Sequence, residues 1–191
     1  RLVKVLDAAG ITSPFPIQTL TIADALEGRD VCGKAKTGSG KTLAFGIPLL
    51  QRMESSADGR PRALVLVPTR ELALQVAREL EPLAEAIGLR AVTVYGGAPL
   101  ERQLAALAQP TDVIVATPGR LIDCIDRDAV SVADLRHVVV DEADRMADMG
   151  FLPQVEWILR RIEGDHQTLL FSATLDGVVD SLVKRYQTDP K

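Results

Sequence analysis

The sequence predicts an α/β fold in which a mainly parallel β-sheet is flanked by helices on both faces. Its apolar runs are short and continuous, as at 63–67, 112–116 and 137–140, which is typical of strands buried on both faces. Segments of helical periodicity separate these runs, and such strand–helix repetition gives a parallel sheet covered by helices. In these folds ligands bind at the carboxyl ends of the strands, so functional residues are expected directly after them.

The first third of the chain is predicted to hold three helices and one strand. The helices cover 1–9, 16–27 and 42–53, and the strand covers 30–33. Gly10 and Gly28 end the first two helices, and Pro16 suits the first turn of the second. Pro48 predicts a kink or a local break in the third helix, because proline removes a backbone hydrogen bond there.

From residue 63 onward strands and helices alternate regularly. Strands are predicted at 63–67, 90–95, 112–116, 137–140 and 168–171, and helices at 70–87, 99–108, 118–126 and 177–186, with helical pieces between 141 and 161. Gly88 closes the helix that begins at Arg70. No repeat, low-complexity run or linker interrupts the pattern, so residues 1–191 are expected to form a single domain.

Composition describes an ordinary soluble globular chain. The net charge of −4 argues against broad electrostatic wrapping of nucleic acid, although a local strip can still hold a few phosphates. No apolar run approaches a membrane span, so no membrane partner is expected. Cys32 and Cys124 lack metal-type spacing and are interpreted as reduced cysteines of a cytoplasmic protein. Because the chain lacks an initiating Met and begins in helical pattern, it is expected to be a fragment.

A glycine-rich stretch between the first strand and the third helix is the strongest chemical signal. It comprises Ala35, Lys36, Thr37, Gly38, Ser39, Gly40, Lys41 and Thr42. A strand, a glycine-rich turn and a helix together form a phosphate cradle, in which Lys41 reaches the terminal phosphates and the Thr42 hydroxyl ligates Mg²⁺. Ala35 departs from the usual pattern, which has glycine there. The alternative is a turn that merely caps a helix.

An acidic tetrapeptide, 141–144, follows the buried run 138–140. At the end of a strand beside a phosphate loop, Asp141 is expected to anchor Mg²⁺. Glu142 is placed to orient or deprotonate the water that attacks the γ-phosphate. The alternative is an acidic first helical turn that the helix dipole favours.

With these motifs the chain resembles the DEAD-box ATP-dependent RNA helicases. The resemblance is to their first RecA-like domain and extends over nearly the whole length of this chain. Residues 10–18 resemble the family's Q motif, whose glutamine, here Gln18, reads the adenine edge of ATP. Phe15 and Lys36 depart from the residues that the family usually has there. The upstream aromatic residue that stacks on adenine has no counterpart before Gln18 at the family's distance.

The resemblance also implies contacts with the sugar–phosphate backbone of single-stranded RNA. The matching residues are Pro68, Thr69 and Arg70, then Gly96 and Gly97, and finally Thr117, Pro118, Gly119 and Arg120. Exposed helix N-termini, glycine N–H groups and arginines bind phosphates without base specificity. Taken singly, each motif has a helix-capping or turn explanation.

Ser172 and Thr174 follow the last predicted strand and resemble the motif that couples ATP hydrolysis to strand separation. Their hydroxyls are expected to hydrogen-bond the Asp144 carboxylate; the alternative is a cap on the next helix. The family implies local RNA unwinding together with a second RecA-like domain, which supplies an arginine finger. Two rival hypotheses are a DNA-tracking ATPase with the same core and an adaptor that uses nucleotide as a switch.

Overall fold

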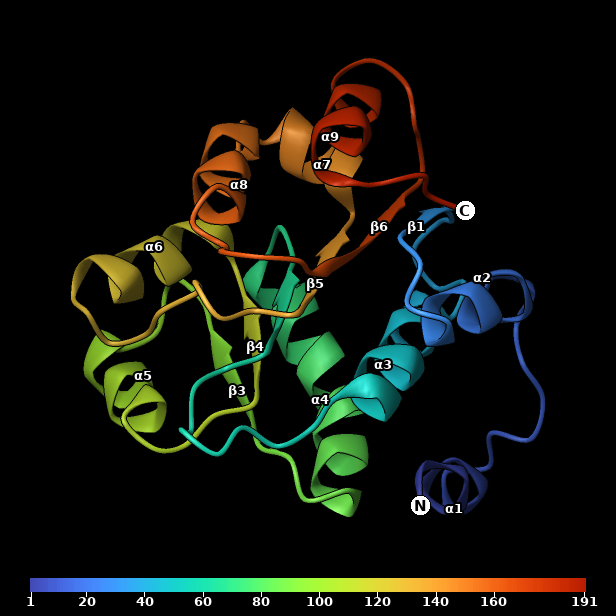
Figure 1. Cartoon of the computed structure of the whole chain (residues 1–191), viewed down its shortest axis with the longest axis horizontal. Helices are drawn as coiled ribbons and strands as arrows, with labels where there is room; N and C mark the ends of the chain where they lie inside the picture. The colour runs from blue at the N-terminus through green and yellow to red at the C-terminus, as the bar shows by residue number, and fades with distance from the viewer.

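The computed structural model describes residues 1–191 and contains one six-stranded sheet (Figure 1). The strands are β1 (Val31–Lys34), β2 (Ala63–Leu66), β3 (Ala91–Val94), β4 (Val113–Ala116), β5 (His137–Asp141) and β6 (Gln167–Ser172). Their spatial order is β1-β6-β5-β2-β4-β3, and every neighbouring pair is parallel. The predicted α/β fold with a parallel sheet is therefore confirmed.

Nine helices cover the two faces of this sheet. They are α1 (Leu2–Ala8), α2 (Pro16–Leu26), α3 (Lys41–Arg52), α4 (Arg70–Ala86), α5 (Leu100–Leu107), α6 (Pro118–Asp126), α7 (Ala143–Asp148), α8 (Leu152–Leu159) and α9 (Val178–Tyr186). Helices α1 to α4 contribute to one hydrophobic core and α5 to α9 to the other, on opposite faces of the sheet (Figure 1). This two-sided burial explains why the strands are continuous apolar runs.

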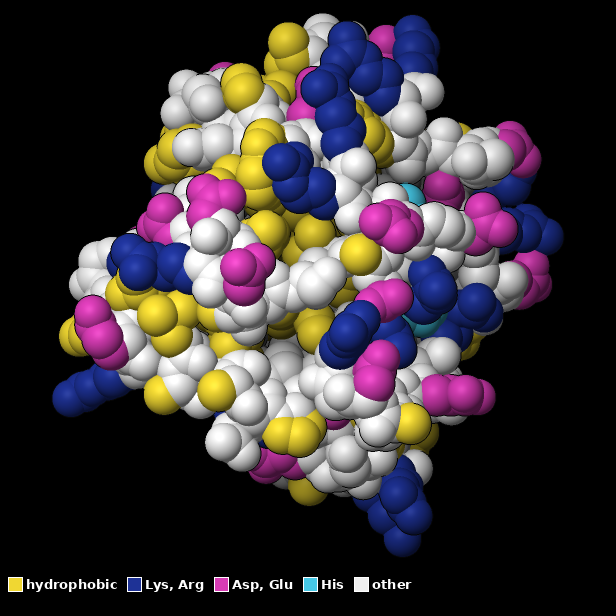
Figure 2. All heavy atoms as spheres, turned by 60° about the vertical axis from the view of Figure 1, so that its left-hand side comes forward, with side chains coloured by type: hydrophobic (Ala, Val, Ile, Leu, Met, Phe, Trp, Pro, Cys, Tyr) yellow, Lys and Arg dark blue, Asp and Glu magenta, His cyan; other side chains and the backbone are white.

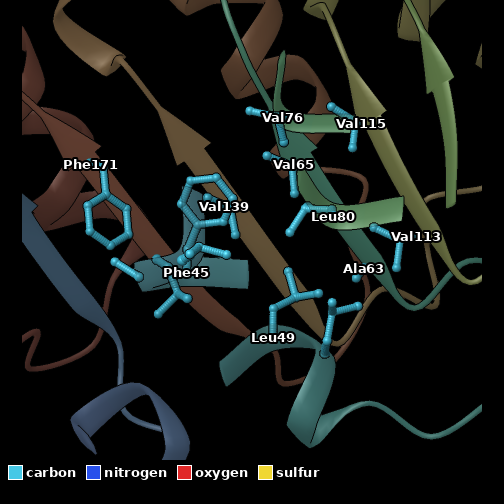
Figure 3. Close-up of a cluster of buried hydrophobic side chains, with 14 of the residues drawn as sticks. Phe45, Leu49, Ala63, Val65, Val76, Leu80, Val113, Val115, Val139 and Phe171 are labelled. Atoms are coloured by element: carbon cyan, nitrogen blue, oxygen red, sulfur yellow. The ribbon is translucent and has the colours of Figure 1, made fainter. Parts of the chain in front are cut away.

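The core beneath α3 and α4 holds the phosphate-loop side of the sheet in place. Phe45 and Phe171 lie with ring centroids 5.7 Å apart, in a tilted arrangement. Leu80 of α4 and the inward-facing valines of β2, β4 and β5 complete the cluster (Figure 3). Because α3 begins directly after the phosphate loop, this packing fixes the helix whose N-terminus faces the candidate site.

Two prolines lie inside helices without ending them. Pro48 is buried within α3, which runs without interruption from Lys41 to Arg52, so of the predicted kink or local break the break does not occur. Pro82 lies likewise within α4. The missing proline N–H costs one helical hydrogen bond, and burial of the flanking side chains against the sheet keeps the helix together.

All six strands end at the same edge of the sheet, because they are parallel and paired in register. The last residues are Lys34, Leu66, Val94, Ala116, Asp141 and Ser172. Each predicted motif other than the Q motif follows one of these ends. No helix combines the length and the apolar character needed to cross a membrane. The face in Figure 2 shows basic and acidic side chains interspersed, in keeping with the modest net charge.

Candidate functional site

The glycine-rich stretch forms an open turn between β1 and α3. Gly38 and Gly40 have φ angles of 81° and 83°, the left-handed region that glycine adopts without strain. Gly40 is the N-cap of α3 and brings no side-chain cap. The backbone N–H groups of Gly38, Gly40 and Lys41 donate to no protein acceptor. The turn therefore offers unpaired donors and the positive end of a helix dipole to an anion.

The side chain of Gln18, in the Q motif, hydrogen-bonds to this loop. Its Nε2 donates to the Gly40 carbonyl oxygen (2.9 Å), and its Oε1 accepts from the Phe15 N–H (2.9 Å). A Cβ at Gly40 would lie 2.7 Å from Gln18 Nε2 and 2.9 Å from the Phe15 ring, so the close approach requires glycine. The amide is buried, and it ties the start of α2 to the phosphate loop.

The chemical centre is a buried ionic cluster beside the loop. Lys41 Nζ lies 3.1 Å from Asp141 Oδ1 and 3.6 Å from Glu142 Oε1, and these side chains are 6%, 2% and 6% exposed. Burial raises the pKa of Asp141 above its ordinary value, and the Lys41 ammonium opposes that rise. Charges this deeply buried are stable only when they are paired.

Backbone geometry directs Glu142 toward the loop. Its φ of 52° places a non-glycine residue in the left-handed region, directly after the end of β5. Residues held in such strained conformations cluster at functional sites. The Glu142 carboxylate accepts a hydrogen bond from Thr37 Oγ1 (2.6 Å) and lies 3.3 Å from Arg145 Nη1. Neither partner was predicted: nothing in the spacing joins residue 37 to residue 142, whereas Arg145 lies at the i,i+3 spacing of a helical pair.

A cavity of about 210 Å³ opens in front of the loop and the ionic cluster. Besides the predicted loop and carboxylate residues, its lining includes Phe15 and three side chains of α4, namely Leu72, Gln75 and Glu79. Sequence reasoning missed these α4 residues, although their spacing of three and four marks one helix face. Burial raises the pKa of Glu79, while the nearby Thr42 hydroxyl and Gln75 amide oppose the rise.

The oxygen donors at this site suit Mg²⁺. Thr42 and Asp141 line the same cavity and offer a hydroxyl and a carboxylate, which are hard oxygen ligands. No group of three or more His, Cys, Asp or Glu side chains could hold a metal ion by itself. That combination is typical of Mg²⁺ sites, in which one or two carboxylates are supplemented by substrate phosphates and water.

The predicted RNA-contacting residues meet at the other half of the same edge, after β2, β3 and β4. Arg70 Nη1 donates to the Gly97 carbonyl oxygen (3.2 Å), and Arg120 Nη1 donates to the Ala98 carbonyl oxygen (3.0 Å). The Arg70 guanidinium also lies 5.3 Å from the centroid of the Tyr95 ring. These contacts join three motifs that are far apart in the sequence into one surface.

The structure tests the helix-capping explanation for Thr69 and for Thr117. Thr69 Oγ1 accepts from the Leu72 N–H (3.3 Å), so Thr69 does cap α4. Thr117 is the N-cap of α6 but makes no side-chain cap bond, which leaves its hydroxyl available. Capping therefore accounts for one of these threonines and not for the other.

The candidate coupling residues lie together in an arrangement that differs from the expected one. Thr174 Oγ1 donates to Asp144 Oδ2 (3.4 Å), as predicted. Ser172 Oγ instead accepts from the Asp144 backbone N–H (3.1 Å). Ser172 ends β6, which pairs with β5, so its hydroxyl faces the unpaired N–H groups at the start of α7 rather than the carboxylate.

Strand order separates the two kinds of motif. The phosphate loop, the coupling residues and the acidic tetrapeptide follow β1, β6 and β5, which are neighbours on one side of the sheet. The three motifs predicted to contact RNA follow β2, β4 and β3, which are neighbours on the other side. Because β5 pairs with β2, the two groups adjoin at the middle of the sheet.

Comparison with known proteins identifies the family. The model of the family described as DEAD/DEAH box helicase matches residues 15–182. The chain is 45% identical over 197 residues to "DEAD-box ATP-dependent RNA helicase 3A, chloroplastic" of Zea mays, covering 100% of this chain and 26% of that protein. It is 44% identical over 191 residues to "ATP-dependent RNA helicase DeaD" of Haemophilus influenzae, covering 100% of this chain and 31% of that protein.

Solved structures agree with this result. The yeast DEAD-box splicing factor Prp28 matches with a TM-score of 0.91 and 34% identity, over 97% of this chain and 46% of that one. A hypothetical ATP-dependent RNA helicase from Sulfolobus tokodaii matches with a TM-score of 0.90 and 34% identity, over 100% of this chain and 55% of that one. The chain thus spans about a quarter to a third of the curated relatives. It belongs to the DEAD/DEAH box helicase family and has the fold of that family's N-terminal RecA-like domain.

Proposed function

We propose that this chain is the ATP-binding half of an RNA helicase, which binds ATP with Mg²⁺ and the backbone of single-stranded RNA. The observation that carries the proposal is the buried Lys41–Asp141–Glu142 cluster, which faces a cradle of unpaired N–H groups. A buried ionic cluster is a weak source of stability, so its presence beside an anion cradle favours a catalytic role.

The residues divide the chemistry among them. The N–H groups of the loop and the Lys41 ammonium would hold the β- and γ-phosphates. The Gln18 amide, which also bonds the Gly40 carbonyl oxygen, would read the adenine edge. Thr42 and Asp141 would hold Mg²⁺, which neutralises the charge that develops on the phosphates. Glu142, held by Thr37, orients and deprotonates the attacking water.

RNA would lie along the ends of β2, β4 and β3. The Arg70 and Arg120 side chains, which meet at this edge, and the N-termini of α4 and α6 would bind phosphates there without reading bases. The contact between Asp144 and the two hydroxyls of Ser172 and Thr174 provides a route by which the nucleotide side can influence neighbouring elements. A second RecA-like domain of the same protein would complete both sites, in a cytoplasmic setting.

Assays of the isolated chain test whether hydrolysis requires the second domain. An arginine finger from the second domain contributes about 10³–10⁵ in rate, so residues 1–191 alone should bind ATP weakly and show almost no RNA-stimulated hydrolysis or unwinding. The assay compares phosphate release with and without single-stranded RNA for this chain and for a version extended by the second domain. Robust RNA-stimulated turnover by the isolated chain would refute the proposal.

A further inference from the structure

A second cavity, of about 330 Å³, opens at the amino end of the sheet, away from the phosphate loop. Its lining includes Arg52, Arg62, Arg136, His137, Ser55 and Ser56. His137 is the first residue of β5 and Asp141 is the last, so at ~3.3 Å per residue roughly 13 Å of strand separates this cavity from the ionic cluster. None of the proposed nucleotide or RNA contacts reaches it.

Two of the arginines are held in place without a carboxylate partner. Arg52 Nη1 donates to the Leu26 carbonyl oxygen (2.9 Å), and Arg136 Nη1 donates to the Glu163 carbonyl oxygen (3.2 Å). Neither guanidinium forms an ion pair. These solvent-exposed hydrogen bonds orient the two side chains and leave their charges without a carboxylate partner.

The rest of the wall links neighbouring strands and carries charges of both signs. The Arg62 carbonyl oxygen accepts from the N–H groups of Arg136 (2.8 Å) and His137 (3.0 Å), which joins the two strands that form the cavity. The Arg62 guanidinium is already paired with Asp58 at 3.0 Å. Glu54 is the one carboxylate in the lining, against three guanidiniums. Asp58 and Asp112 also accept hydrogen bonds from Ser56 in the lining, so the positive charge that lacks a carboxylate partner is that of Arg52 and Arg136.

His137 lines the same cavity, and the charge of Arg52 affects its pKa. Its Nδ1 lies 3.3 Å from Gln167 Oε1, and the ring is partly buried. Burial lowers the pKa of His137 below its ordinary value, and the charge of Arg52 lowers it further. The imidazole is thus a reporter of charge inside the cavity.

We propose that this cavity binds a doubly charged tetrahedral oxyanion, either as the free ion or as the phosphate group of a small molecule, between Arg52, Arg136 and His137. Charge-assisted hydrogen bonds from fixed guanidiniums suit this shape and charge. The occupant is small rather than an RNA strand, because the cavity measures only about 330 Å³ and the candidate RNA surface lies at the opposite edge of the sheet.

The test monitors the titration of His137 by NMR in the 191-residue chain. The titration is carried out in sodium sulfate and in sodium chloride at equal ionic strength. Sulfate is a dianion throughout the titration, so a bound ion should raise the pKa of His137 relative to chloride. Arg52→Gln and Arg136→Gln should each raise the half-saturating sulfate concentration at least about fivefold, because each removes one partly exposed charge-assisted contact. Arg60→Gln is the matched control, because Arg60 lies nearby but is paired with Asp134 at 3.0 Å.

A phosphomonoester such as ribose 5-phosphate then separates the two sources. Tighter binding than sulfate assigns the site to a phosphorylated small molecule, whereas equal binding assigns it to the free ion. An identical His137 titration in sulfate and chloride would overturn the proposal. So would a sulfate response that survives in the Arg52→Gln/Arg136→Gln double variant, with the fold of each variant checked by circular dichroism.

Discussion

Replacing Lys41 by Met tests the energetics of the buried cluster without the need for a ligand. Methionine keeps most of the apolar stem but removes the ammonium that lies 3.1 Å from Asp141 and 3.6 Å from Glu142. Two carboxylates then remain buried, with only the half-exposed Arg145 near one of them. Breaking a buried pair in this way costs about 3–5 kcal/mol of unfolding free energy at neutral pH.

The loss should depend on pH with a definite sign. The pKa of Asp141 is already raised by burial, and removing Lys41 removes the charge that opposes the rise. The folded variant therefore binds a proton more readily than the unfolded chain does. Its stability is fully present below the ordinary carboxyl pKa and is lost as pH rises through the raised folded-state pKa, with a slope of at most about 1.4 kcal/mol per pH unit.

Urea unfolding between pH 5 and 8, followed by the fluorescence of the single tryptophan, Trp157, measures this directly. Lys41→Met should lose less stability relative to the wild type at pH 5 than at pH 8. Adding Asp141→Asn should restore part of the loss and flatten the pH dependence, because the substitution removes the unpaired charge. A deficit that is independent of pH and is unaffected by Asp141→Asn would refute this explanation.

Two further variants examine the surroundings of the loop. Gln18→Ala in the two-domain protein should reduce the preference for ATP over GTP, because the amide expected to read the adenine edge is lost. An unchanged ratio of the two dissociation constants would count against the assigned role. Gly33→Ala would place a Cβ 2.5 Å from the buried Phe171 ring and should lower the unfolding free energy by about 1–3 kcal/mol. The control is Gly119→Ala, whose Cβ meets nothing within 4 Å and which should be near neutral. Equal effects of the two substitutions in urea unfolding would contradict the packing described for Gly33.

The fold could be predicted from the sequence because its strands are continuous apolar runs that alternate with helical periods. Element ends agree to within one or two residues, as for α4, predicted at 70–87 and found at Arg70–Ala86. The parallel arrangement follows from the same alternation. Pro48 does not break α3, because burial against the sheet keeps the helix intact and local propensity takes no account of that burial.

The order of the strands could not be predicted, since the sequence does not say which strands are neighbours. That order is what puts β6 between β1 and β5 and so brings Ser172 to the start of α7. It also decides that side chains of α4 reach the phosphate-loop cavity, and that Thr37 meets Glu142 across 105 residues of chain. Motif spacing predicted which residues form the site, and tertiary packing determined how they pair.

The most direct test of the central claim is RNA-stimulated ATP hydrolysis by the two-domain protein carrying Glu142→Gln. Glutamine keeps the size of the side chain and can still accept from Thr37, but it cannot take a proton from water. We expect turnover to fall by at least about 10²-fold, the usual contribution of a general base, while ATP-dependent RNA binding persists. Hydrolysis at the wild-type rate would contradict the assignment of Glu142 and, with it, the catalytic role proposed for the buried cluster.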